Sequence, residues 1–220
     1  SPGDIYVWFR HRPSAAVGTR PQQISLGGVM IATILADLAV RGDNYCLERY
    51  LYAEGYGCVA GCDEAGRGPL AGPVVAACVV LPQVCDHSLF VDSKILTHRQ
   101  RLAVHDHLHE RGVCYGLGVV SERTIDAINI LQASLLAMRR AVDNLSGPVP
   151  DFLLIDGTFT LALDTAQAPL VKGESKSSSI AAASILAKVE RDRIMVECHH
   201  RYSAYNFQQN KGYPTREHRL

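Results

Sequence analysis

The amino-acid sequence predicts a single α/β domain. From Gly57 onward, short apolar stretches alternate with longer segments whose apolar residues recur at helical spacing. The stretch at 73–81 (PVVAACVVL) is apolar on both faces, which is typical of a central strand with helices on both sides of its sheet. The 220 residues are 47% hydrophobic and 20% charged, which excludes wholesale disorder, collagen and coiled coil and allows a substantial core.

The first expected elements surround a glycine-rich turn. Apolar spacing predicts an amphipathic helix over 31–53 whose inward face carries four leucines, Leu35, Leu38, Leu47 and Leu51. A strand is expected over 58–63, ending in the sequence DEAGRG, and the strand at 73–81 follows it. Helical spacing returns over 97–111, and a further strand is expected over 113–120.

The second half of the chain continues the alternation. Apolar residues on one face predict a single long helix over 121–145, which ends before Gly147-Pro148. A short buried strand over 152–155 delivers Asp156 at its end, and residues 170–171 close another strand. A helix over 177–199 is followed by an irregular basic tail over 202–220. We expect three arginines near this tail to lie on a solvated face and add positive potential, Arg191, Arg193 and Arg201.

Residues 1–30 are expected to form a poorly ordered extension before a domain over 31–220, because prolines and scattered arginines dominate their beginning. A secretory signal is the alternative, since an apolar stretch over 26–36 follows the arginines, but Asp37 and Arg41 come at once after it. The seven cysteines contain no C-x-x-C pair, which favours free thiols in a reducing compartment. We therefore expect a cytoplasmic protein that does not contact membranes.

The formal net charge is zero, with 22 basic and 22 acidic residues. This excludes a uniformly basic nucleic-acid binder but not a local basic face. Residues 172–220 contain nine Lys and Arg against five Asp and Glu, so the carboxyl-terminal end is the basic part of the chain.

Acidic residues lie at the ends of predicted strands or in the loops beside them: Asp63 and Glu64, Asp156, and Glu174. Open α/β sheets place their sites at the carboxyl ends of strands. Converging carboxylates repel one another unless cations lie between them, and Mg²⁺ prefers such oxygen ligands. Two such ions can activate a water and stabilise the leaving oxygen of a phosphodiester. The pattern therefore predicts a divalent-metal site.

A tight turn, Gly66-Arg67-Gly68, follows the first acidic pair. It is not a phosphate-binding Walker A loop, because no Gly-Lys-Ser/Thr follows, and the next glycine, Gly72, is one residue late for G-x-G-x-x-G. Its exposed backbone amides can approach a sugar–phosphate backbone where a side chain would block contact.

Five blocks, in order, resemble the signature blocks of type 2 ribonuclease H: GCDEAGRGPLAGPVVAACVVL (61–81), VDSKILT (91–97), LLIDG (153–157), KGESKSSSIAAASILAKVERDR (172–193) and NKGYPTREH (210–218). The resemblance runs from about residue 47 to 220. It implies a ribonuclease H-like α/β fold, a mixed sheet flanked by helices in one catalytic domain. It also implies an endonuclease that hydrolyses the RNA of RNA/DNA hybrids and cuts 5′ to single ribonucleotides in duplex DNA, leaving 3′-hydroxyl and 5′-phosphate ends.

The resemblance also implies roles for the acids. Asp63, Glu64 and Asp156 match the family's catalytic, metal-binding carboxylates, which use two Mg²⁺ or Mn²⁺ ions during catalysis. Glu174 stands where the family has Asp in a Lys-Gly-Asp block. Its extra methylene moves the carboxylate by about a bond length, whereas metal sites tolerate errors of only about 0.5 Å. We therefore expect Glu174 to serve the second metal less well, with slower turnover and a stronger preference for Mn²⁺.

Substrate contacts follow from the same resemblance. Gly66, Arg67 and Gly68 match the loop whose backbone senses the ribose 2′-hydroxyl, and Tyr213 matches the tyrosine that packs on the neighbouring deoxyribose. The expected phosphate contacts are Lys94 and Lys172.

The expected partner is an RNA/DNA hybrid or a ribonucleotide-containing DNA duplex, bound by a monomer. Family members usually continue past the block that ends near Leu220, and a shorter tail is expected to cost stability or duplex affinity. Two alternatives remain at this point. Glu174 and the short tail are compatible with a hybrid-binding protein that has lost catalysis, and the acids alone are compatible with a metal-dependent phosphatase. The basic, aromatic-containing tail argues against a small substrate.

Overall fold

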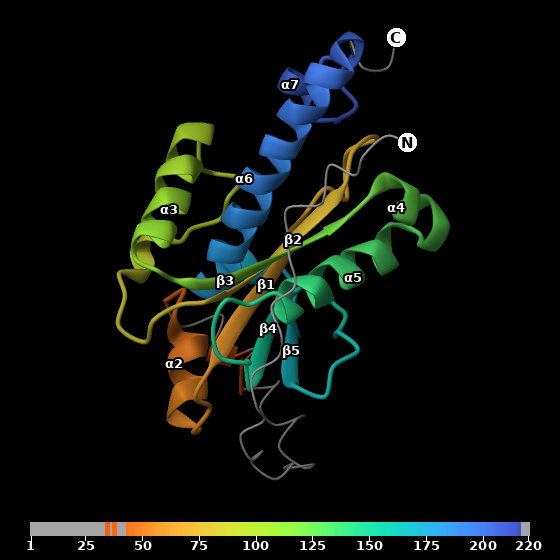
Figure 1. The fold of residues 1–220 in the computed structure, drawn as a ribbon. Helices are drawn as coiled ribbons and strands as arrows, with labels where there is room; N and C mark the ends of the chain where they lie inside the picture. The colour runs from red at the N-terminus through yellow and green to blue at the C-terminus, as the bar shows by residue number, and fades with distance from the viewer. Residues whose placement is uncertain (1–33, 36, 39–42, 217–220) are drawn as a thin grey trace.

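A five-stranded mixed sheet forms the centre of the computed structural model, which describes residues 34–35, 37–38 and 43–216 (Figure 1). The expected extension over 1–30 lies outside the described residues. The strands are β1 (Val59–Ala65), β2 (Val74–Val80), β3 (Cys114–Val120), β4 (Phe152–Asp156) and β5 (Ala166–Leu170). They lie in the order β3-β2-β1-β4-β5.

The direction of pairing changes at β1. Strands β1, β2 and β3 form antiparallel pairs, whereas β1 pairs in parallel with β4, and β4 with β5. Cys62 lies opposite Ile155 in the parallel pair. The residues that follow, Asp63 and Asp156, therefore leave neighbouring strands at the same edge of the sheet. The α/β fold with a mixed sheet is confirmed.

Helices cover both faces of this sheet (Figure 1). Helix α5 packs on β2 and β3, whereas α6 packs on β1 and β2 and is itself contacted by α3. The helices are α2 (Cys46–Ala53), α3 (His98–Glu110), α4 (Glu122–Ile128), α5 (Ile130–Asp143), α6 (Ser178–Arg201) and α7 (Phe207–Asn210). Short 3₁₀ turns occupy His87–Leu89, Gly173–Ser175 and Ser203–Tyr205. None of the described helices is long and apolar enough to cross a membrane.

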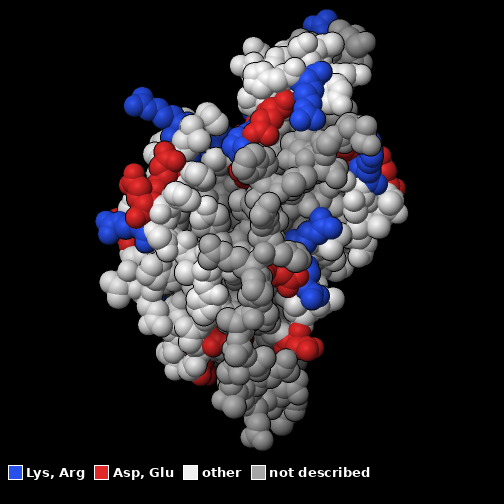
Figure 2. All heavy atoms as spheres, viewed as in Figure 1, with Lys and Arg blue, Asp and Glu red and all other residues white. Residues whose placement is uncertain are grey.

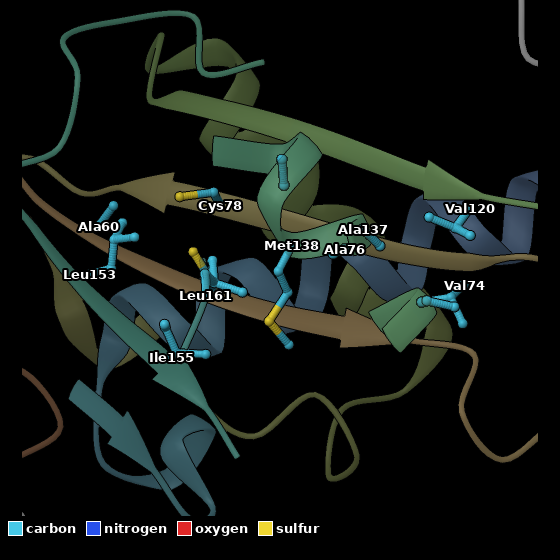
Figure 3. Packing of buried hydrophobic residues seen from close by; sticks show 13 residues of the cluster. Ala60, Val74, Ala76, Cys78, Val120, Ala137, Met138, Leu153, Ile155 and Leu161 are labelled. Atoms are coloured by element: carbon cyan, nitrogen blue, oxygen red, sulfur yellow. The ribbon is translucent and has the colours of Figure 1, made fainter. Parts of the chain in front are cut away.

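Small residues let both helices approach the sheet closely. In the core of Figure 3, Met138 and Ala137 of α5 pack over the strands, where Ala76 and Cys78 are fully buried. On the other face, a Cβ atom on Gly61 would lie 2.3 Å from the backbone nitrogen of Ile180 in α6. The apolar start of α6 thus packs directly on β1, as the small residues of its sequence predict. All seven cysteines are free thiols, as expected.

The helix expected over 31–53 is not continuous. Residues 43–45 are not helical, and α2 begins only at Cys46. The Asp43 carboxylate accepts a 3.0 Å hydrogen bond from the Tyr45 backbone N–H, a local bond that competes with helix formation. Leu35, Leu47 and Leu51 are nevertheless fully buried, as the spacing predicts.

The single helix expected over 121–145 is also wrong, because Asn129 divides it into α4 and α5. Asn129 has φ 69°, and its side chain accepts a 3.1 Å hydrogen bond from the Gln132 N–H at the start of α5. Asparagine is a favoured N-cap because its side-chain oxygen can accept such a hydrogen bond, so the break has a local cause. The tail expected to be irregular contains α7, and the strand expected to close at 170–171 is β5, which begins at Ala166 and ends at Leu170.

We predict that Asn129→Ala lowers the free energy of unfolding by about 1–2 kcal/mol, because it removes the cap and places a Cβ-bearing residue without a polar side chain at positive φ. Asn129→Gly is the matched control, since it removes the same cap but relieves the backbone. Urea denaturation measures both. An unchanged midpoint for Asn129→Ala would contradict this explanation of the break.

Candidate active site

Two carboxylates from neighbouring parallel strands form the centre of the site. Asp63 near the end of β1 is only 4% exposed, and Asp156 ends β4. The Asp63 carboxylate accepts a 2.7 Å hydrogen bond from the backbone N–H of Glu64. Asp156 accepts a 2.6 Å bond from the N–H of Gly173, which ties the next loop to the strand end.

Burial and mutual repulsion disfavour the charged forms of these acids. The pKa of Asp63 is raised well above its ordinary value, first by burial and then by the nearby charges of Glu64 and Asp156. Burial also raises the pKa of Glu64, although the Arg67 guanidinium opposes this. The pKa of Asp156 is raised by burial, against the hydrogen bond from Gly173. The three acids therefore form an electrostatically coupled group.

Glu64 faces a hollow of about 290 Å³ on the α5 side of the sheet. Its Oε1 accepts a 3.2 Å bond from Arg67, whereas its Oε2 is buried without a hydrogen-bond partner. Asp156 and Lys172 also line the hollow, with Ser134 and Met138 from α5. The hollow thus has acidic oxygens on one side and two basic side chains, Arg67 and Lys172, at its rim.

Glu174 lies in the 3₁₀ turn Gly173–Ser175 and is only 7% exposed. Its carboxylate forms an ion pair with Lys94 and accepts a 3.3 Å hydrogen bond from Ser184 of α6. The Ser184 hydroxyl is in turn 2.8 Å from that of Ser93. The hydrogen bond to Glu174 raises the pKa of Lys94. Lys94, expected to contact phosphate, therefore neutralises the fourth acid here.

These carboxylate oxygens are ligands of the type that divalent cations bind. Among the described residues, no group of three or more His, Cys, Asp or Glu side chains is arranged so that it could already hold a metal ion. The unpartnered Oε2 of Glu64 and the raised pKa of Asp63 are nevertheless features that a nearby cation would relieve. A set made only of carboxylates suits Mg²⁺ or Mn²⁺.

The glycine turn and the tail lie side by side. Gly66 has φ 114°, a conformation that side chains rarely adopt, and Gly68 faces Tyr213: a Cβ on Gly68 would lie 3.6 Å from the Tyr213 ring. A 2.8 Å backbone bond from Leu70 to Gly212 joins the two segments. Tyr213 is 40% exposed. Residues about 145 positions apart in the sequence thus form one surface beside the acids.

One arginine expected to be solvated is buried among the described residues. Arg191, expected on a solvated face of α6, is 0% exposed, whereas Arg193 is exposed and pairs with Glu190 and Glu197. A signal was available, because Arg191 lies four residues after the buried Ala187 and so falls on the same helix face. Figure 2 shows basic and acidic side chains interspersed over the described part of one face, without a continuous basic stripe.

A family model described as ribonuclease HII matches residues 60–220. The chain belongs to the ribonuclease HII family. Ribonuclease HII of Desulfotalea psychrophila is 57% identical over 179 residues, which cover 80% of each chain. That of Syntrophus aciditrophicus is 52% identical over 172 residues, which cover 78% of this chain and 81% of the relative.

Solved structures of other ribonucleases have a similar fold. The ribonuclease H2 of Pyrococcus horikoshii has a TM-score of 0.62 at 27% identity, over 72% of this chain and 82% of that one. A ribonuclease HIII solved in complex with Mn²⁺ has a TM-score of 0.57 at 18% identity, over 86% of this chain and 62% of that one, and shows the fold alone. As a ribonuclease HII, the protein is an enzyme, an endoribonuclease of RNA/DNA hybrids.

We predict that the carboxylate of Asp63 destabilises the metal-free protein at neutral and higher pH. Because the pKa is raised in the fold from its ordinary 3.8, the native state keeps its proton where the unfolded chain has lost it, so stability falls as pH rises above that value. Asp63→Asn should therefore be more stable than the wild type in chelator near pH 8, with a smaller difference near pH 4.

Thermal unfolding in chelator at several pH values measures this. Asp126→Asn, at an exposed position of α4, is the matched control and should leave the profile unchanged. A difference between Asp63→Asn and wild type that does not grow with pH would contradict the electrostatic account.

Proposed function

We propose that Asp63, Glu64, Asp156 and Glu174 hold two divalent cations, Mg²⁺ or Mn²⁺, during cleavage. The observation that carries this proposal is the burial of Asp63 beside Glu64 and Asp156, which costs free energy unless positive charge is supplied. When bound, such ions supply the Lewis acidity that activates water and stabilises negative charge on a phosphodiester. Carboxylates at the ends of two parallel strands keep their ligand oxygens in place on rigid elements.

The reaction we propose is cleavage on the 5′ side of a ribonucleotide, in a hybrid or as a single ribonucleotide in duplex DNA. A water oxygen bonds to phosphorus and gives up one proton, the bond from phosphorus to the O3′ of the preceding nucleotide breaks, and that oxygen takes up a proton, so that no net proton is gained or lost. The products carry 3′-hydroxyl and 5′-phosphate ends. Lys172, exposed at the rim of the hollow, is placed to contact a substrate phosphate, whereas Lys94 has to leave Glu174 before it can do so.

Selection of the RNA–DNA junction is assigned to the surface formed by the glycine turn and Tyr213. Gly68, which is exposed, leaves the backbone accessible to a ribose 2′-hydroxyl, the group that distinguishes RNA from DNA, and the buried Gly66 forms the positive-φ turn before it. The Tyr213 ring, partly exposed beside Gly68, offers a flat surface to a sugar that lacks this hydroxyl. The closeness of the turn and the Tyr213 segment, joined by the bond from Leu70 to Gly212, supports the proposal that they contact two adjacent sugars.

Cleavage of a duplex with one embedded ribonucleotide tests the proposed chemistry. We predict cutting 5′ to the ribonucleotide with Mg²⁺ or Mn²⁺, none with chelator, and a loss of about a hundredfold or more in Asp63→Asn. Gel analysis of end-labelled products identifies the cut and its end groups. Binding without cutting under every condition would instead support a hybrid-binding protein that has lost catalysis.

A second prediction concerns Glu174. Glu174→Asp restores the shorter carboxylate of the family pattern, so we expect the rate with Mg²⁺ to rise severalfold and the Mn²⁺-to-Mg²⁺ rate ratio to fall. Glu174→Gln keeps the length but removes the charge, and should slow the reaction with both ions. Initial rates on one substrate measure these effects. An unchanged rate with Mg²⁺ in Glu174→Asp would show that the extra methylene is not limiting.

A further inference from the structure

Among the described residues, Arg191 in the middle of α6 has the largest fully buried side chain. Its guanidinium donates to three backbone carbonyls: Nε to Pro73 at 3.0 Å, Nη2 to Ala71 at 3.0 Å and Nη1 to Lys211 at 2.9 Å. Within the part of the chain that the structure describes, no carboxylate forms an ion pair with it. Burying a charged guanidinium against uncharged carbonyl groups costs free energy. This cost suggests that Arg191 has a role other than filling the core.

The three carbonyls belong to two segments that are far apart in the sequence. Ala71 and Pro73 follow directly after the Gly66–Gly68 turn, whereas Lys211 precedes Tyr213 by two residues. The planar guanidinium, with donors in a fixed fork, therefore joins the ribose-reading turn to the segment that carries the tyrosine.

Two glycines, Gly66 and Gly212, lie where the two segments and the Arg191 guanidinium meet, and neither position has room for a side chain. A Cβ on Gly66 would lie 2.7 Å from the Arg191 Nε and 2.5 Å from the Pro73 carbonyl oxygen. A Cβ on Gly212 would lie 2.3 Å from the Ala71 carbonyl oxygen. The backbone of each segment is thus packed against the guanidinium or against the other segment without room for a methyl group.

The Tyr213 ring also lies against this cation. The Arg191 Cζ is 5.9 Å from the ring centroid, and the Lys188 Nζ, which pairs with Asp192, is 5.5 Å from it. Both distances are in the range of cation–π attraction. The same guanidinium therefore contacts the backbone of the tail and the ring that the tail presents.

We propose that Arg191 is a positioning residue that sets the spacing between the Gly66–Gly68 turn and Tyr213, and that this spacing determines selectivity for an RNA–DNA junction. The inference rests on the proposed function, in which the turn and the tyrosine read adjacent sugars. Arg191 is fully buried, so it acts through these two segments. Its loss should reduce junction selectivity more than cleavage of a continuous RNA strand.

Arg191→Lys tests this proposal, because it keeps the charge but places all donors on one nitrogen. The measured quantity is the ratio of kcat/KM for a duplex with one embedded ribonucleotide to kcat/KM for a continuous RNA strand paired with DNA. We expect the ratio to fall about tenfold, since a misplacement of about 1 Å can cost up to about a hundredfold in rate. Arg193→Lys, the same change at an exposed position of α6, should leave the ratio unchanged.

Tyr213→Ala should lower the same ratio, and the double variant with Arg191→Lys should fall no further than Tyr213→Ala alone, because both act through one element. If Tyr213→Ala lowers the ratio and folded Arg191→Lys does not, the role of Arg191 is wrong while the proposed function stands. If Tyr213→Ala leaves the ratio unchanged, junction reading by this tyrosine is wrong, and the role of Arg191 fails with it.

Gly212→Ala covers the case in which Arg191→Lys does not fold. It pushes the tail away from Ala71 without changing the buried cation, and it should lower the ratio in the same direction. A wild-type ratio in folded Gly212→Ala would overturn the proposal that this spacing determines selectivity.

Discussion

The parallel pairing of β1 with β4 places Asp63 and Asp156 at the same edge of the sheet, and Glu64 follows directly on β1. Helices α5 and α6 enclose this edge from opposite faces, and the close approach of α6 at Gly61 leaves Asp63 little contact with water. The fold thereby holds like charges together where solvent cannot screen them. This arrangement costs stability, and the proposed cations would offset that cost.

Positive side chains around the site fall into two groups. Arg67 and Lys94 pair with Glu64 and Glu174 and reduce the repulsion among the acids. Arg191 bonds to backbone carbonyls instead and joins the Gly66–Gly68 turn to the segment that carries Tyr213. In the proposed function, chemistry and substrate selection therefore depend on different cations, although α6 contributes to both through Ser184 and Arg191.

The sequence predicted the sheet and the acids better than it predicted the links between distant segments. Strand-end positions were enough to place Asp63 and Asp156 together. Asn129 was missed because apolar spacing continues across it, although a cap residue was visible. The pairing of Glu174 with Lys94 and the burial of Arg191 depend on residues about 80 and 120 positions away, which no local pattern encodes. Such contacts follow only from the packed fold.

Calorimetric titration of the metal-free protein with Mg²⁺, in two buffers of different ionisation enthalpy, tests the central claim most directly. If Asp63, Glu64 and Asp156 are coupled ligands with raised pKa values, ion binding near neutral pH releases protons, and Asp63→Asn both weakens binding and reduces that release. Equal affinity in Asp63→Asn and wild type, with no proton release in either, would contradict the account.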